Sequence, residues 1–284
     1  MKGIVTRIQS NLYIVKLEDK KVVECVAKGL LKYKKTSMLV GDMVEVNDNN
    51  VIEKIYPRKN EFVRPPIANI DQIIIVVATT NPTPDLMLLD KQLVTAERNG
   101  VDVVICVNKI DLEADYSNII EVYENIGYQV ITTTAKNGIG IDKIARILVN
   151  KITAFSGNSG VGKSALTNNI FNLEISKEGE TSEKLQKGKH TTKHVELFEF
   201  AENSYIADTP GFSSFDVDGI NCKDLDKYFI EFTPYISECE YRSCNHIKEQ
   251  NCGVKKAVAK KKIDKGRYER YVTLFEKMKG EKKW

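Results

Sequence analysis

The chain has 284 residues, 42% of them hydrophobic and 29% charged, which is typical of a globular protein with room for two or three domains. The longest apolar run, at 73–78, is too short to cross a membrane, and residues 1–15 lack the apolar core and cleavage site of an export signal. We therefore expect a cytoplasmic protein without a membrane partner and without disulfides.

The net charge of +3 is unevenly distributed. Residues 1–67 carry 13 Lys+Arg against 8 Asp+Glu, residues 68–254 carry 17 against 27, and residues 255–284 carry 12 against 4. Two basic ends around an acidic middle favour contact of the ends with a polyanion. Ends that are simply solvated would have the same composition, so charge alone does not decide between the two interpretations.

Residues 1–67 are predicted to form a small β-barrel. Short β-branched or alternating runs, separated by polar turns, are expected to be strands at 3–8, 11–17, 21–29, 43–46 and 51–56. Five strands in so short a segment favour an OB-fold, although the fold alone does not establish oligonucleotide binding. The double proline of RPPIAN (64–69) is expected to interrupt regular structure.

Residues 68–220 alternate strand and helix patterns, which predicts a parallel α/β sheet with helices on both faces. Strands are expected at 70–79, 101–109, 128–135, 151–157, 195–200 and 204–208. Helices are expected at 85–100, 116–127, 140–150 and 163–172, with a long polar loop at 174–194. Residues 221–284 are predicted to be mainly helical, beginning with a helix at 223–232.

The string GNSGVGKS at 157–164 matches the phosphate-loop pattern G-x-x-x-x-G-K-[ST] between a strand and a helix. Its glycines and the helix N-terminus would direct backbone N–H groups at phosphate oxygens, Lys163 would bridge the β- and γ-phosphates and assist catalysis, and Ser164 would ligate Mg²⁺. The expected phosphate contacts are Gly157, Asn158, Ser159, Gly160, Val161, Gly162, Lys163, Ser164 and Ala165.

The string NKID at 108–111 ends a predicted strand and is typical of a guanine-reading loop. Asp111 could accept hydrogen bonds from N1–H and the N2 amine of guanine, which adenine cannot provide. Asn108 would hold the loop and approach O6/N7, and the Lys109 stem would cover the base. TAK at 134–136 could offer a backbone N–H to O6. The expected base contacts are Asn108, Lys109, Ile110, Asp111, Ala135 and Lys136.

Two further segments are predicted to sense the γ-phosphate. In DTPG (208–211), Asp208 would reach Mg²⁺ through a water, and the Gly211 N–H would approach the phosphate. In the polar loop before it, spacing favours Thr192 over Thr191 as a Mg²⁺ ligand.

The residue after the DTPG glycine is Phe212, which cannot orient the attacking water as a glutamine can. Either another residue supplies this function, for which His190 is the candidate, or a partner raises a low intrinsic rate. Together, these segments are the five loops of a GTP-binding domain in the order 4-5-1-2-3. This order remains compatible with one site because all five loops leave the same edge of a sheet.

The cluster Cys239, Cys244, His246 and Cys252 offers a full tetrahedral ligand set for one structural Zn²⁺ per chain. Three buried cysteines beside a surface histidine are the alternative. Cys25 and Cys106 are expected to be core residues.

The permuted order, the N-terminal barrel and the motifs NKID, GNSGVGKSAL, GKHTT, DTPGF and C-x4-C-x-H-x5-C together resemble the RsgA (YjeQ/YloQ) family of circularly permuted GTPases. The resemblance implies a monomeric cytoplasmic enzyme that hydrolyses GTP to GDP under stimulation by the small (30S) ribosomal subunit. It also implies rRNA contact through the barrel and the zinc domain. Lys189 stands where the family usually has arginine. A GTP-gated binding module with incidental hydrolysis, and a metal-delivery GTPase, remain the alternatives.

Overall fold

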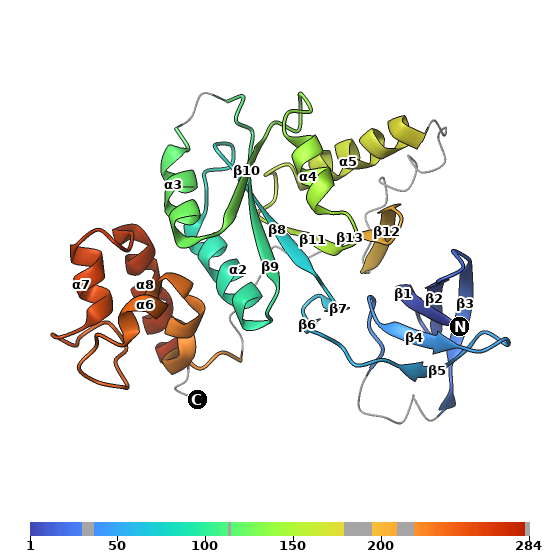
Figure 1. Ribbon diagram of the computed structural model, residues 1–284, viewed down its shortest axis with the longest axis horizontal. Helices are drawn as coiled ribbons and strands as arrows, with labels where there is room; N and C mark the ends of the chain where they lie inside the picture. Colours follow the sequence, from blue (N-terminus) through green and yellow to red (C-terminus); the bar gives the residue numbers. More distant parts are fainter. Residues whose placement is uncertain (30–36, 113–114, 179–194, 209–218, 282–284) are drawn as a thin grey trace.

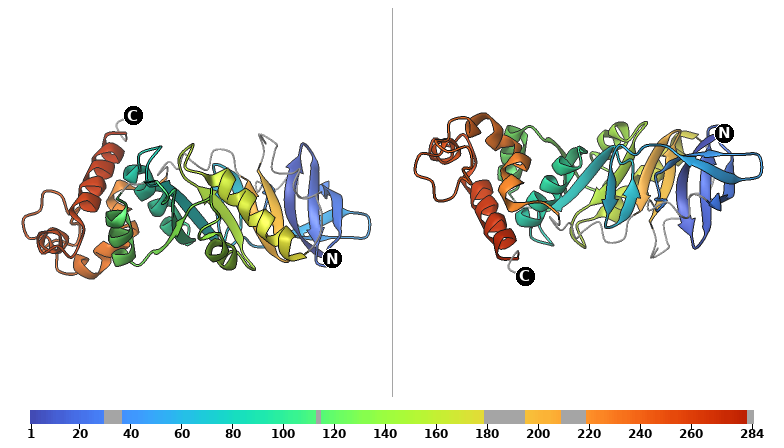
Figure 2. Two further views of the ribbon diagram at one scale, coloured as in Figure 1. Left: turned by 90° about the horizontal axis from the view of Figure 1, so that it is seen from above. Right: turned by 90° about the horizontal axis from the view of Figure 1, so that it is seen from below.

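The computed structural model describes residues 1–29, 37–112, 115–178, 195–208 and 219–281. Its parts lie in a row (Figures 1 and 2), with the barrel and the N-terminus at one end, the α/β sheet in the middle and the C-terminal helices at the other end. No helix within these ranges is both long and apolar enough to cross a membrane.

The barrel consists of β1 (Lys2–Gln9), β2 (Leu12–Leu17), β3 (Val22–Ala27), β4 (Met43–Val46) and β5 (Val51–Ile55). The strands pair in the order β1-β2-β3-β5-β4, and β4 pairs back with β1, which closes the barrel. Alternating residues point inward and form the core of Val5, Val15, Leu17, Cys25, Val44, Val46 and Ile52. The five predicted strands and the barrel are confirmed.

A short hairpin was missed at the end of the barrel. Strands β6 (Glu61–Val63) and β7 (Pro66–Ala68) form a separate two-stranded sheet where we expected only a break. Proline is tolerated at the first residue of a strand, because its missing N–H costs little there. Phe62 and Ile67 pack in the same hydrophobic cluster as Ile73 of the central sheet.

The central sheet contains five parallel strands, as the alternating pattern predicted. Their order is β10 (Gln129–Thr133), β9 (Asp102–Asn108), β8 (Gln72–Ala78), β11 (Ile152–Ser156) and β13 (Ser204–Asp208). Strand β12 (Glu196–Ala201) is an exception to the predicted parallel sheet, since it runs antiparallel to β13. The connection at 202–203 has only two residues, which can join antiparallel strands but not parallel ones.

Helices cover both faces of this sheet: α2 (Leu86–Arg98) and α3 (Ser117–Ile126) on one, α4 (Ile141–Ile147) and α5 (Lys163–Glu178) on the other. Side chains of β8 alternate between the two layers, so that Ile75 packs towards α2 and α3, and Val76 towards α4 and α5. Helix α5 continues to Glu178, where we expected a loop from 174. The sequence gives a reason, because no glycine or proline occurs between 163 and 178.

Residues 219–281 form the predicted helical C-terminal part. It contains 3₁₀ helices η2 (Cys222–Tyr228) and η3 (Ile230–Phe232), followed by α6 (Thr233–Ile236), α7 (Gly253–Ala259) and α8 (Lys265–Glu281). The helix expected at 223–232 is therefore a pair of 3₁₀ helices. The non-helical backbone of Phe229 separates them, and its ring packs edge-on against Tyr271, with the ring centroids 5.0 Å apart.

The barrel joins the central sheet along strand β12. β1 pairs antiparallel with β12 at Arg7 and Glu196, so that the barrel and the central sheet are hydrogen-bonded to each other. Three ion pairs connect the barrel to the β12–β13 hairpin: Arg7–Glu196, Lys16–Glu199 and Lys20–Glu202. The three glutamates occur at every third position of the hairpin, and each faces a cation of the first two barrel strands or the turn after them.

Candidate nucleotide site and metal centre

The carboxyl ends of the parallel strands bring the predicted nucleotide-binding segments to one edge of the sheet. Asn108 is the last residue of β9, residues 134–136 follow β10, and residues 157–164 join β11 to α5. Asp208 ends β13 at the same edge and is exposed. Ligands of open parallel sheets bind at this edge. Segments that are far apart in the chain therefore face one region of space.

The Asn108 side chain holds three of these segments together. Its Nδ2 donates to the Val161 carbonyl in the phosphate loop at 2.8 Å. Its Oδ1 accepts from the Thr133 hydroxyl at 3.0 Å and from the Ala135 N–H at 3.1 Å. The side chain is 1% exposed, so loss of these bonds would leave buried polar groups unpaired. These contacts join the base-reading loop to the phosphate loop and to the TAK segment.

The TAK segment is fixed from two sides. The Ala135 N–H, one of the TAK backbone donors that could meet guanine O6, donates to Asn108 in this structure, so a contact of this N–H with O6 would have to share the donor. On the other side, Asn169 of α5 donates from Nδ2 to the Ala135 carbonyl at 2.6 Å. Thr133 and Asn169 were not predicted. Of the two, only Thr133 has a sequence feature that could have indicated it, the polar TTT run at the end of β10.

Two glycines of the phosphate loop are required by close approach. Gly162 has φ +104, and a Cβ there would lie 2.2 Å from Asn108 Nδ2. Gly157 has φ +128, and a Cβ there would lie 2.2 Å from the Val76 carbonyl oxygen of β8. Side chains at either position would push the phosphate loop away from the central strands. The glycine spacing of the motif therefore follows from packing as well as from phosphate binding.

The Lys163 ammonium folds back over the phosphate loop. It donates to the carbonyls of Gly157 and Asn158 at 2.7 and 2.8 Å. Burial lowers the pKa of this half-buried ammonium below its ordinary value, because few waters can solvate the charge. An anion bound in the loop would restore favourable electrostatic interactions for this amine.

The remaining predicted contacts lie around this core of the site. The Lys109 amine donates to the Asn81 carbonyl in the loop after β8, so its stem lies between the base-reading and β8 loops. Ile110 is half-buried and packs on the core below α2 and α3. The exposed members are Asp111, Lys136, Ser159, Gly160, Ser164 and Ala165, which leaves them accessible to a ligand. His190, Thr191, Thr192, Gly211 and Phe212 lie outside the described residues.

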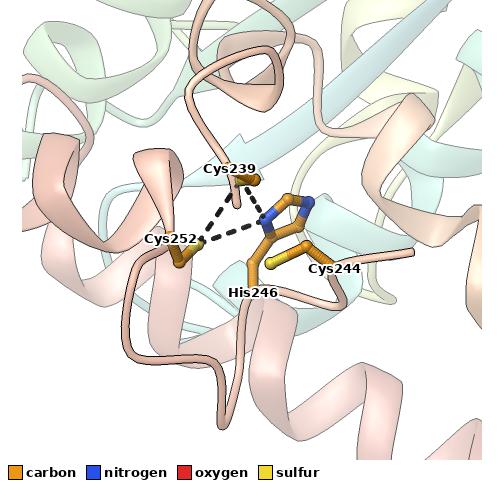
Figure 3. A group of neighbouring side chains, drawn as sticks. All are labelled: Cys239, Cys244, His246 and Cys252. Atoms are coloured by element: carbon orange, nitrogen blue, oxygen red, sulfur yellow. Dashed lines mark hydrogen bonds between the residues drawn. The ribbon is translucent and has the colours of Figure 1, made fainter. Parts of the chain in front are cut away.

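The four predicted metal ligands converge in the C-terminal part (Figure 3). The ligand atoms of Cys239, Cys244, His246 and Cys252 all lie within 4.8 Å of one another. His246 Nδ1 is 3.5 Å from Cys239 Sγ and 3.3 Å from Cys252 Sγ, and these two sulfur atoms are 3.9 Å apart. Tetrahedral Zn²⁺ with its usual bond lengths places sulfur atoms about 3.8 Å apart and nitrogen about 3.6 Å from sulfur. The donor set fits zinc.

The electrostatics of the cluster also favour a bound cation. Burial, together with the negative charge of Cys252, raises the pKa of the Cys244 thiol to about 12. The pKa of Cys239 lies below its ordinary value. Burial acts to raise this pKa, but hydrogen bonds from the N–H groups of Gly253 and Val254 to the thiolate outweigh that effect. Three thiolates cannot share this space without a positive charge between them, and a divalent metal supplies that charge.

Buried ion pairs attach α8 to the central domain, and sequence reasoning missed them. Arg267, which is fully buried, donates to Asp90 of α2 at 2.5 Å and to Glu231 of η3 at 2.7 Å. Arg270 donates to the second oxygen of Asp90 at 2.5 Å. The Tyr123 hydroxyl of α3 donates to Asp90 at 2.6 Å. Burial opposes the charge of Arg267, but the carboxylates of Asp90 and Glu231 hold its pKa above the ordinary value.

Known proteins are similar to this chain over nearly its full length. Residues 2–53 match the family model of the RsgA N-terminal domain, and residues 55–218 match that of the RsgA GTPase. A small ribosomal subunit biogenesis GTPase RsgA from Alkaliphilus metalliredigens is 40% identical, with 100% of this chain and 99% of the relative covered. The protein of the same name from Ruminiclostridium cellulolyticum is 42% identical over 98% of this chain and 93% of its own length.

Solved structures agree in both fold and permuted order. The crystal structure of YjeQ from Thermotoga maritima has a TM-score of 0.84 and 35% identity, covering 98% of each chain. That of YloQ, described as a circularly permuted GTPase, has a TM-score of 0.82 and 32% identity, covering all of this chain and 96% of the other. With matches over the barrel, the permuted sheet and nearly its whole length, this chain belongs to the RsgA family of circularly permuted GTPases.

Proposed function

We propose that GTP binds at the carboxyl edge of the sheet, with guanine on the 108–111 loop and the phosphates on the 157–164 loop. The observation that carries this proposal is the buried Asn108 side chain, which joins both loops across 53 positions of sequence. Asp111 accepts from N1–H and N2 of the base, and the Lys109 stem covers it. The backbone N–H groups between Gly157 and Ala165 bind the phosphates.

Positive charges placed around the γ-phosphate promote its hydrolysis. Lys163 exchanges its two loop carbonyls for β- and γ-phosphate oxygens, where its charge stabilises the transferred group. Mg²⁺, when bound, would neutralise charge that develops on the phosphates. Ser164 and Thr192 would hold it directly, and Asp208 would hold it through a water. The Gly211 N–H completes the γ-phosphate contacts.

We further propose that the protein is a monomeric cytoplasmic enzyme that acts in late maturation of the small ribosomal subunit. Relatives that carry this role in their names align over their full length at about 40% identity. The basic residues of 1–67 and 255–284 provide cations for rRNA phosphates. Cosedimentation with small subunits is the direct test.

Small subunits should retain the protein with a non-hydrolysable GTP analogue more strongly than with GDP, and should stimulate its GTP turnover. Retention should fall steeply between 50 and 200 mM salt, as expected when several phosphates are contacted. Large subunits serve as the control. Binding in the GTP state without any stimulation of turnover would support a GTP-gated binding module instead.

Replacing His190 with alanine should lower stimulated turnover by about 10²-fold or more, with GTP affinity little changed, if this residue orients the attacking water. Single-turnover hydrolysis with and without small subunits measures both rates. Lys184→Ala, in the same segment but outside the GKHTT motif, provides a matched control. Unchanged basal and stimulated rates in His190→Ala would remove this residue from the mechanism.

For the C-terminal part we propose one structural Zn²⁺ held by Cys239, Cys244, His246 and Cys252. All four positions of a tetrahedral ion are filled by protein ligands, so no position remains open for a substrate. A metal-delivery role would need a labile ion, whereas a structural ion stabilises the surrounding fold. The close packing of the His246 ring against Phe232, with the ring centroids 5.9 Å apart, favours the structural role.

A further inference from the structure

The His246 imidazole has a different partner at each of its nitrogens. Nδ1 faces the cysteine sulfur atoms, at 3.3 Å from Cys252 and 3.5 Å from Cys239 (Figure 3). Nε2, on the opposite side of the ring, lies 3.4 Å from the Asp226 carboxylate oxygen Oδ2. The ring is fully buried, so neither nitrogen can turn to water. Of the two, Nδ1 is the one placed to ligate a metal.

The Asp226 carboxylate is poorly satisfied by the protein alone. Its side chain is 15% exposed, and its other oxygen, Oδ1, is a buried atom without a hydrogen-bond partner among the described residues. Burying an unpaired carboxylate oxygen costs free energy unless a positive charge lies close by. A zinc-bound imidazole carries part of the metal charge, so it would compensate this carboxylate better than a neutral histidine.

We propose that Asp226 is the positioning residue of the metal centre. It accepts a hydrogen bond from the Nε2–H of His246, which fixes the tautomer whose Nδ1 lone pair points at the cysteine sulfur atoms. A carboxylate in this position also makes the imidazole a stronger ligand, because it stabilises positive charge on the ring. This inference rests on the zinc site proposed above and adds a residue outside the Cys/His motif.

The position of Asp226 in the chain gives this contact a wider effect. Asp226 lies in η2, the first described helix after residues 209–218 and thus after the predicted DTPG segment. Its neighbour Leu225 is fully buried in the core of the C-terminal part, and η2 packs on α2 of the GTPase domain. The GTPase domain continues into the C-terminal helices through η2. The hydrogen bond from His246 to Asp226 therefore attaches this connecting segment to the metal centre.

The test compares two aspartates of η2 in the full-length protein. Asp226→Ala should weaken Zn²⁺ binding by roughly 10- to 100-fold, measured by competition with a chromophoric chelator. Asp226→Asn keeps an acceptor oxygen but loses the charge, so its affinity should lie between those of the wild type and Asp226→Ala. Asp224→Ala is the matched control. The Asp224 side chain pairs with the exposed Lys227 at 2.6 Å, so its loss should leave the affinity unchanged.

Cobalt supplies a second measurement that does not depend on folding stability. The visible absorption of Co²⁺ reports ligand field, so Asp226→Ala should shift the bands while Asp224→Ala should not. Equal zinc affinity and equal cobalt spectra in the wild type and both Asp226 variants would overturn the proposal, even if Asp226→Ala unfolded at a lower temperature. Failure of the wild type itself to bind Zn²⁺ would instead reject the zinc site and, with it, this role of Asp226.

Discussion

Replacing Asp111 with asparagine should change the preferred base from guanine to xanthine. Guanine offers two donors, N1–H and the N2 amine, to the carboxylate, whereas xanthine offers N1–H and a carbonyl, which match the oxygen and the amine of asparagine. Two hydrogen bonds to a charged acceptor contribute about 1.5–3 kcal/mol each, so GTP affinity should fall by roughly 10²- to 10⁴-fold. XTP affinity should rise correspondingly, and competition against a fluorescent nucleotide measures both.

A control for this change exists in the same loop. Asp115 is exposed and accepts from the Ser117 N–H at 3.0 Å and its hydroxyl at 2.6 Å, which asparagine can also do. Asp115→Asn should leave the GTP-to-XTP ratio unchanged. If Asp111→Asn also left the ratio unchanged, guanine would not be read by the 108–111 loop, and the proposed nucleotide site would have to be abandoned.

Replacing Asp90 with asparagine should strongly destabilise the attachment of α8 to α2. Asp90 accepts from both Arg267 and Arg270 in a region where Arg267 and Asp90 are almost completely buried. Removing one member of a buried ion-pair network leaves an uncompensated charge and costs about 3–5 kcal/mol. We therefore expect a lower urea midpoint for the C-terminal part and faster hydrogen exchange at the amides of α8 and the facing turns of α2.

The exposed pair Asp142–Arg146 on α4 is the matched control for this experiment. Its atoms lie 3.3 Å apart, but the side chains are 55% and 80% exposed, so Asp142→Asn should change the free energy of unfolding by less than about 1 kcal/mol. Similar small effects from Asp90→Asn and Asp142→Asn would mean that the buried network does not hold the two parts together.

The nucleotide motifs could be predicted from sequence because their position at strand ends follows from pattern alone. A strand that ends in NKID and another that runs into GNSGVGKS must place both loops at one edge if the sheet is parallel. The sequence does not reveal which side chains join the loops. Thr133 and Asn169 contact this site through the register of β9 and β10 and the rotation of α5, and these are properties of tertiary packing.

The metal ligands could be predicted from sequence, whereas the charged residues that contact them or join α8 to α2 could not. Cys239, Cys244, His246 and Cys252 are recognisable because four potential metal ligands cluster within fourteen residues. Asp226 lies 20 positions from His246, and Arg267 lies 177 positions from Asp90, so no spacing rule connects them. Charged residues on helices ordinarily face solvent, and only the packing of η2 and α8 shows that these do not.

Irregular local structure was the least predictable part of the fold. Pro66 was expected to end regular structure, yet it begins β7, because the strand needs no N–H from its first residue. The 3₁₀ helices at 222–232 replaced an expected α-helix, since the burial of Phe229 and Phe232 requires a tighter and interrupted turn. In both segments tertiary contacts overrode local preference.

The ion pairs at the two joints change how the positive ends of this protein should attract a polyanion. Residues 1–67 have a surplus of five positive charges, but Arg7, Lys16 and Lys20 are matched by glutamates of the β12–β13 hairpin and Lys59 is matched by Asp71, which leaves one. Residues 255–284 have a surplus of eight, of which Asp90 and Glu231 match two, which leaves six. Since long-range attraction depends on uncompensated charge, the C-terminal helices should contribute most of the electrostatic steering toward RNA, and the barrel much less.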